Sequence, residues 1–195
     1  RLMEMEADAG GGTVCAAGID IRALRKARSM TLAELAGLLG RSTGWLSPVE
    51  RGQAEPAIAD LRRISQLFDI HISFFFRNEA APEEERRLIV RRRSRGRLGS
   101  NEDGLTEELL SPDLSGDFEM IRSVFAPGTS SDWREARKST DAGYLVSGIL
   151  HLWIGNREFV LEPGDSFRFR AARYRWRNPG DEPAEIIWVV SPPIY

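Results

Sequence analysis

The sequence predicts a two-domain α+β protein in which the first part is helical and the second part is all-β. Up to residue 77, apolar residues recur at the spacing of three and four positions that amphipathic helices show. After about residue 118 they form short runs divided by Gly, Pro and Asn, as expected for strands joined by turns. We expect a flexible tail at 1–18, a helical domain at 19–77, a linker at 78–104 and a β domain at 105–195.

The helical part carries the start signals of two short, successive helices. Thr31 precedes an apolar run and Glu34 follows three residues later, which is the capping-box pattern of a helix N-terminus. Ser42 is a suitable N-cap for the next helix. These signals predict helices at about 32–39 and 43–51 with a tight turn between them. The second helix is short and exposes small polar residues, as a helix that enters the DNA major groove requires.

The β part contains no long helical pattern. Its apolar and β-branched residues lie in short runs, and turn-forming pairs such as Gly155-Asn156 and Pro163-Gly164 separate them. Short strands at this spacing predict a sandwich or a barrel. The clearest runs are 118–125, 144–154, 157–161, 166–169 and 186–190.

The net charge of −2 conceals an uneven distribution of charge along the chain. The segment 19–77 has nine Lys and Arg against six Asp and Glu, and 78–97 has seven against four. The segment 98–195 has ten against sixteen. The basic excess therefore lies in the first half, where a DNA-binding protein needs it to neutralise phosphates.

The composition excludes several classes of protein. A hydrophobic share of 42% is too high for a disordered chain. The single cysteine, Cys15, rules out an internal disulfide framework and suits the reducing cytoplasm. No apolar run approaches the roughly 20 residues of a membrane span, and the chain does not open with a signal-peptide pattern. We therefore expect a cytoplasmic protein with no membrane partner.

The helical part resembles the Xre-type, lambda-repressor-like helix-turn-helix family over the stretch LRKARSMTLAELAGLLGRSTGWLSPVERGQAEPAIADLRRISQLF. The most specific portion is STGWLSPVERG, which a proline and a further helical pattern follow. The resemblance implies a DNA-binding domain of five helices. It also implies an ion pair between Glu50 and Arg25 that ties the third helix to the first.

The resemblance further assigns roles at the expected DNA surface. Base-reading positions are held by Thr43, Gly44, Ser47 and Pro48, and positions near phosphates by Thr31, Arg41, Ser42 and Arg51. Phosphate contacts would position the domain, and base contacts would specify the operator sequence. Pro48 departs from the family, whose members commonly carry glutamine there, and proline cannot form a bidentate contact to adenine. We therefore expect a readout that depends more on apolar contacts and DNA shape.

The β part resembles the small cupin domain, a jelly-roll barrel or double-stranded β-helix. The phrases that carry the resemblance include GYLVSGILHLWIGNREFVLEPGDSFRF and RNPGDEPAEIIWVVSPP. Metal-binding cupins place histidines and a glutamate inside the barrel, whereas the matching positions here fall near Glu135, Arg137, Asp141 and Tyr174. A set without imidazole suits a transition metal poorly. We expect no metal, no cofactor and no catalytic residues, and therefore no enzyme.

A barrel of this kind can hold one small ligand. We expect an effector pocket lined by Glu135, Arg137, Asp141, Tyr144, Tyr174 and Trp176. The alternative is that the aromatic side chains simply fill the core of the barrel. The charges leave the chemistry of the effector open, since Arg137 suits an anion whereas Asp141 and Glu135 suit an amine.

These expectations favour a sequence-specific transcription regulator that binds double-stranded operator DNA as a homodimer and responds to an unknown small-molecule effector. One alternative is a cupin-type metalloenzyme, similar to an epoxidase or isomerase, with a vestigial helix-turn-helix head. Bound iron or zinc at stoichiometric level would favour that alternative. A second alternative is a constitutive DNA-binding protein whose barrel serves only for dimerisation.

Overall fold

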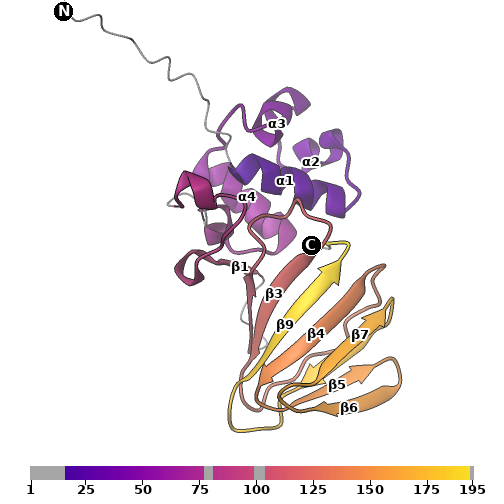
Figure 1. The fold of residues 1–195 in the computed structure, drawn as a ribbon. Helices are drawn as coiled ribbons and strands as arrows, with labels where there is room; N and C mark the ends of the chain where they lie inside the picture. Colours follow the sequence, from indigo (N-terminus) through magenta and orange to yellow (C-terminus); the bar gives the residue numbers. More distant parts are fainter. Residues whose placement is uncertain (1–15, 77–80, 99–103, 194–195) are drawn as a thin grey trace, which may run out of the picture.

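The computed structural model describes residues 16–76, 81–98 and 104–193 of the chain. Figure 1 shows the helices gathered at one end of the molecule and the sheets at the other. The helical domain consists of α1 (Ala16–Ala27), α2 (Leu32–Leu38), α3 (Thr43–Glu50), α4 (Ile58–Phe68) and the 3₁₀ helix η1 (Ile72–Phe76). The connecting segment adds the 3₁₀ helices η2 (Glu83–Glu85) and η3 (Arg92–Ser94). Within the described residues, every helix falls short of the length and apolar character needed to cross a membrane.

The expectation of five helices is wrong, because the described part of the helical domain contains four α-helices. Helix α4 ends where Asp69 adopts a left-handed backbone conformation with φ 54°. Ile70 then forms an isolated β-bridge with Leu98, so the chain leaves the helical path. The following element, η1, is a 3₁₀ helix of five residues, and its run of aromatics has modest helix propensity.

The ends of the expected tail and of the expected linker differ from the ends of the helices and strands. The predicted tail at 1–18 lies outside the described residues as far as residue 15, and α1 already begins at Ala16. The predicted linker at 78–104 contains the short strand β1 (Gly96–Leu98), which pairs antiparallel with β2 (Leu105–Leu109).

Side-chain caps explain where α2 and α3 begin. The Thr31 hydroxyl accepts the Glu34 N–H at 3.2 Å, and the Glu34 carboxylate accepts the Thr31 N–H at 2.6 Å, so the capping box is present. The Ser42 hydroxyl accepts the Trp45 N–H at 3.2 Å. Between the helices, Gly40 has a φ of 64°, a left-handed conformation that glycine adopts at little cost. Local sequence therefore sets both helix starts and the turn between them.

The β domain consists of two antiparallel sheets that share one core. Its further strands are β3 (Glu119–Phe125), β4 (Thr140–Ser147), β5 (Leu150–Ile154), β6 (Arg157–Leu161), β7 (Ser166–Arg170), β8 (Tyr174–Arg177) and β9 (Ala184–Ser191). The larger sheet has the order β1-β2-β3-β9-β4-β7, and the smaller sheet has the order β6-β5-β8. Buried side chains from both sheets, among them Phe125, Leu145, Leu152 and Trp176, pack in a single apolar cluster.

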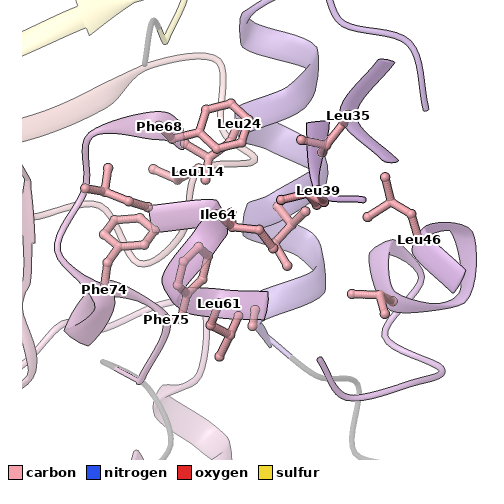
Figure 2. Close-up of a cluster of buried hydrophobic side chains, with 14 of the residues drawn as sticks. Leu24, Leu35, Leu39, Leu46, Leu61, Ile64, Phe68, Phe74, Phe75 and Leu114 are labelled. Carbon is pink, nitrogen blue, oxygen red and sulfur yellow. The ribbon is translucent and has the colours of Figure 1, made fainter. Parts of the chain in front are cut away.

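The two domains are joined by a packed interface as well as by the chain between them. Leu98, Leu109 and Leu114 of the β part are buried in the same apolar cluster as the helices. Figure 2 shows Leu114 beside Leu24 and Phe68 of the helical domain. The Leu114 N–H also donates to the buried Asp20 carboxylate of α1 at 3.3 Å. The helical domain is thus docked on the β domain, which brings residues of both domains to one site.

Candidate DNA interface and ligand cavity

Helix α3 has one buried face and one accessible face. Leu46 and Val49 are fully buried and Glu50 nearly so, which holds the helix against the domain core. The positions predicted to read bases lie on the other face: Thr43 and Gly44 are exposed, and Ser47 and Pro48 are partly exposed. The spacing of these positions, one and four residues apart, places them on a single side of the helix. The accessible face of α3 therefore collects all four predicted base readers.

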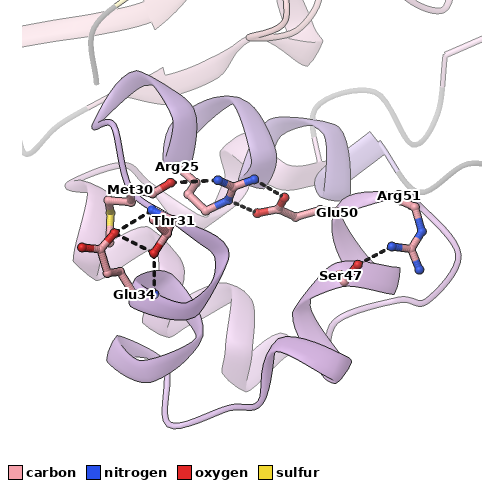
Figure 3. A network of polar contacts seen from close by, with 7 residues as sticks. All are labelled: Arg25, Met30, Thr31, Glu34, Ser47, Glu50 and Arg51. Atoms are coloured by element: carbon pink, nitrogen blue, oxygen red, sulfur yellow. Dashed lines mark hydrogen bonds and ion pairs between the residues drawn. The ribbon is translucent and has the colours of Figure 1, made fainter.

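A buried ion pair fixes α3 against α1. Arg25 donates from Nε and Nη2 to the two carboxylate oxygens of Glu50, at 2.6 Å and 2.7 Å. Its Nη1 donates to the Met30 carbonyl at 2.8 Å. Figure 3 shows this fork beside the Thr31–Glu34 cap. The pair implied by the resemblance is present, and it sets the position of α3 relative to the rest of the domain.

Arg41, predicted to lie near a phosphate, is paired with a buried carboxylate, although its own side chain is 41% exposed. It donates from Nε and Nη2 to the two carboxylate oxygens of Asp60, both at 3.0 Å, and Asp60 is only 1% exposed. Its guanidinium also lies over the Trp45 ring, 5.1 Å from the centroid. Sequence reasoning did not predict the partner, because Asp60 lies in another helix. Arg41 therefore holds a buried carboxylate and joins α3 to α4.

The other predicted phosphate contacts lie at the ends of α2 and α3. The hydroxyls of Thr31 and Ser42 are both used as helix caps. Arg51 is exposed just after α3, where it donates to the Ser47 hydroxyl and, at 2.9 Å, to Gln53 Oε1. Of these residues, Arg51 is the cation that can exchange its exposed side-chain contacts for a phosphate.

A cavity of about 240 Å³ lies where the helical domain meets the sheets of the β domain. This volume equals that of about eight water molecules at roughly 30 Å³ each, which suits a small metabolite. The helical domain contributes Arg28, Phe68, Asp69 and Ile70 to the wall, and the β part contributes residues of β1 to β4, β8 and β9. The cavity is therefore a joint product of both domains.

Two carboxylates in the cavity wall are partly shielded from solvent and hydrogen-bonded to serines. Glu107 accepts from the Ser123 hydroxyl at 3.0 Å, and Asp141 accepts from the Ser139 hydroxyl at 2.8 Å. Burial raises the pKa of the Glu107 carboxyl, although Ser123 and nearby arginines oppose the shift. Burial likewise raises the pKa of the Asp141 carboxyl. Both carboxylates would gain from a cationic group placed beside them.

Four of the six predicted pocket residues line the cavity: Arg137, Asp141, Tyr174 and Trp176. Glu135 is exposed and does not line the cavity, and Tyr144 is 50% exposed. Tyr144 is misplaced because strand residues alternate between faces, so that Asp141 and Leu145 point inward from β4 and Tyr144 points outward. Prediction missed Glu107, Glu119 and Arg134, and the four residues from the helical domain. The available signal for Glu107 was its place in β2 midway between Leu105 and Leu109, which are buried, because residues two apart in a strand lie on the same face.

The residues present do not fit a metal site of the cupin type. Nowhere in the described ranges do three His, Cys, Asp or Glu side chains lie where they could hold a metal ion together. The cavity carboxylates Glu107 and Asp141 lie near Arg134 and Arg137, whose positive charges oppose a divalent cation. Imidazole, the ligand that transition-metal sites favour, does not line the cavity.

Comparison with known proteins finds two matching family models. A helix-turn-helix domain matches residues 16–71, and a cupin domain matches residues 121–190. The HTH-type transcriptional regulator PuuR of Escherichia coli is 22% identical over 153 residues, covering 78% of this chain and 81% of that protein. An HTH_3 family transcriptional regulator from Vibrio cholerae is 20% identical, with a TM-score of 0.46 over 92% of this chain and 96% of its own. A solved structure of FeII HppE is 16% identical to this chain, with a TM-score of 0.48. The match covers 91% of this chain and 98% of that one.

Proposed function

We propose that this chain is a helix-turn-helix transcriptional regulator with a C-terminal cupin domain, in which α3 reads operator DNA and an effector in the cavity modulates this binding. The observation that carries the proposal is the shared cavity wall. Arg28 and Asp69 of the helical domain face the same cavity as Asp141 and Tyr174 of the barrel. An effector bound there would touch the DNA-binding domain itself.

A chain of direct contacts runs from the cavity to α3. Arg28 lines the cavity and directly follows α1. Helix α1 is tied to α3 by the Arg25–Glu50 pair and by the close approach of Gly18 to the backbone of Val49. An effector can change DNA affinity only through its different affinity for two arrangements of the protein. A small displacement of α1 against the barrel would supply the second arrangement, because α3 would move with it.

We propose that the regulator acts as a homodimer formed through the cupin domain. The support is a set of large apolar side chains that are exposed in the chain segment from β4 to β6: Tyr144, Val146, Ile149, Phe159 and Val160. Exposed apolar surface that a partner can cover commonly marks an interaction site. Two helix-turn-helix domains related by a two-fold axis would read half-sites about one DNA turn apart.

We propose a regulatory role without enzymatic activity, exercised in the cytoplasm where the DNA lies. The curated relative PuuR of Escherichia coli, which matches over 78% of this chain, is a transcriptional regulator by name. The cavity offers both acids and arginines, but the described residues contain no group of three His, Cys, Asp or Glu that could hold a metal ion. These features favour binding over catalysis.

The proposal is tested by selecting duplexes from a random-sequence pool with the full-length protein. We expect enrichment of a two-fold symmetric sequence with half-sites separated by about one helical turn, 10–10.5 base pairs. A pool that stays random after repeated rounds, with the folded protein recovered at each, would contradict the proposal.

The roles of Thr43 and Arg51 predict different outcomes of substitution. Arg51→Gln should weaken binding to all duplexes alike and lower the slope of log affinity against log salt by about one, because one phosphate contact is lost. Thr43→Ala should alter the preferred bases instead. Fluorescence anisotropy at several salt concentrations measures both effects, and Arg168→Gln on the exposed side of β7 is the matched control. A uniform loss across all duplexes with Thr43→Ala would contradict its assignment as a base reader.

A further inference from the structure

The cavity wall carries charges of both signs in nearly equal number. Its described lining contains three arginines and four carboxylates, namely Arg28, Arg134, Arg137, Asp69, Glu107, Glu119 and Asp141. A site for a simple anion would show a surplus of arginines, and a site for a simple amine would show a surplus of acids. Neither surplus is present here.

The charges at the barrel side of the cavity lie close together without forming ion pairs. Glu107 and Asp141 are hydrogen-bonded to serines, and within the described residues neither forms an ion pair with Arg134 or Arg137. The arginines are nonetheless near enough to act electrostatically: Arg134 and Arg137 both act on Glu107, and Arg137 also acts on Asp141. Because these carboxylates and arginines are close together but not ion-paired, the carboxylates can bind a cationic group of a ligand while the arginines bind an anionic group of the same ligand.

We propose that the cavity binds a zwitterionic small molecule, an amino carboxylic acid in chemical class. Its ammonium group would bind between Glu107, Asp141 and the Tyr174 hydroxyl, and its carboxylate would bind Arg134 and Arg137. A bound zwitterion pairs every one of these charges without adding net charge to the cavity. An amine alone would instead meet the two arginines, and a carboxylate alone would meet the two acids.

The surroundings of these charges fit such a ligand. Arg137 is exposed, so it lies where the cavity reaches solvent, while Glu107 and Tyr174 are buried more deeply. The aromatic rings of Trp176 and Trp188 also line the wall, and they offer apolar contact to a short aliphatic or aromatic side chain. The ligand would therefore enter with its ammonium end leading. This inference rests on the proposed effector role of the cavity.

Thermal unfolding of the full-length protein with matched probes tests the ligand class. Norvaline and δ-aminopentanoate carry both charges at different separations, pentylamine carries only the ammonium, and pentanoate carries only the carboxylate. We expect at least one of the two zwitterions to raise the Tm by about 4 °C or more, and we expect no shift from the singly charged probes at equal concentration. The inference is overturned if pentylamine or pentanoate matches the zwitterions, or if neither zwitterion shifts the Tm.

Two substitutions test the assigned charges with the zwitterion that binds best. Glu107→Gln and Arg137→Gln should each weaken its affinity about tenfold or more, since each removes one of the two opposite charges. Glu162→Gln and Arg168→Gln are the matched controls, because both residues are exposed and lie outside the cavity wall. Quenching of tryptophan fluorescence reports the affinity. Equal losses in all four variants, or no loss in the first two, would contradict the assignment.

The outcomes separate this inference from the proposed function. The ligand titrations use no DNA, and duplex binding is measured independently by anisotropy. If zwitterions bind but no duplex does, the ligand class stands and the regulator proposal fails. If duplexes bind and no zwitterion does, the regulator proposal stands and the ligand class is wrong.

Discussion

Replacing Gly18 by alanine is expected to destabilise the DNA-binding domain by about 3 kcal/mol or more, at the upper end of the range for overpacked sites. A Cβ atom at Gly18 would lie 1.9 Å from the Val49 carbonyl oxygen and 3.0 Å from its carbonyl carbon. These are backbone atoms of α3, so no side chain can move aside. Helices α1 and α3 would have to separate, which would strain the Arg25–Glu50 pair and open the core around Leu46.

Urea unfolding followed by far-UV circular dichroism, a signal that helices dominate, measures this effect. Gly37→Ala is the matched control, because it makes the same change within a helix. A Cβ atom at Gly37 would meet nothing within 4 Å, and the residue is exposed in α2. We expect this control to stabilise the domain by about 0.5–1 kcal/mol through helix propensity and a less flexible unfolded chain. Similar free energies for the two variants would contradict the close contact of α1 with α3.

Replacing Glu50 by alanine is expected to cost about 3–5 kcal/mol, since it leaves the mostly buried Arg25 guanidinium without its counter-charge. The Arg25 side chain is 13% exposed and that of Glu50 is 5% exposed, so water compensates little. One hydrogen bond to the Met30 carbonyl would remain. Loss of the pair would also release α3 from α1, so duplex affinity should fall together with stability.

The control for this prediction is Glu85→Ala, which removes the carboxylate of an ion pair on the protein surface. Its partner Arg91 is 61% exposed, and solvent-exposed pairs contribute little to stability. We expect the unfolding midpoint of this control to stay close to that of the unsubstituted protein. If Glu50→Ala unfolds at the same urea concentration as Glu85→Ala, the Arg25–Glu50 pair does not hold the helices together.

The parts of the fold that depend on near neighbours in the sequence could be predicted from it. The Thr31–Glu34 cap and the Ser42 cap mark the starts of α2 and α3, because each hydrogen bond spans three residues. The change to short, turn-separated runs likewise predicted an all-β second domain, a sandwich or a barrel, and the structure has two antiparallel sheets there. The five-helix expectation failed at the point where tertiary pairing took over, since Ile70 bridges to Leu98 of the β part.

The candidate cavity was predictable only on its barrel side. Asp141 and Tyr174 could be placed through the resemblance to metal-binding cupins, whereas Tyr144 was misplaced, because a shift of one residue along a strand reverses the face. Arg28 and Asp69 enter the wall only because the helical domain docks on the cupin part. Periodicity within a segment holds no information on that docking. Periodicity likewise could not predict the partner of Arg41, because Arg41 precedes α3 and the buried Asp60 lies in α4.

The α1–α3 contact and the shared cavity form one route from the cavity to the helix that is proposed to read DNA. Gly18 and Glu50 hold α3 against α1, and Arg28 at the end of α1 faces the cavity. The elements that stabilise the domain are therefore the same elements that could carry a signal from an effector to DNA. Substitutions along this route should change stability and DNA affinity in parallel, whereas Thr43→Ala should change base preference alone.

Titration of a labelled duplex with the full-length protein, repeated over a range of salt concentrations, tests most directly whether the accessible face of α3 binds DNA. If the accessible face of α3 binds DNA, affinity should fall linearly with salt on logarithmic axes, and a bulky Thr43→Trp substitution on that face should abolish it while the unfolding midpoint stays unchanged. Absence of duplex affinity at low salt, or binding that the Thr43→Trp change leaves intact, would contradict the claim.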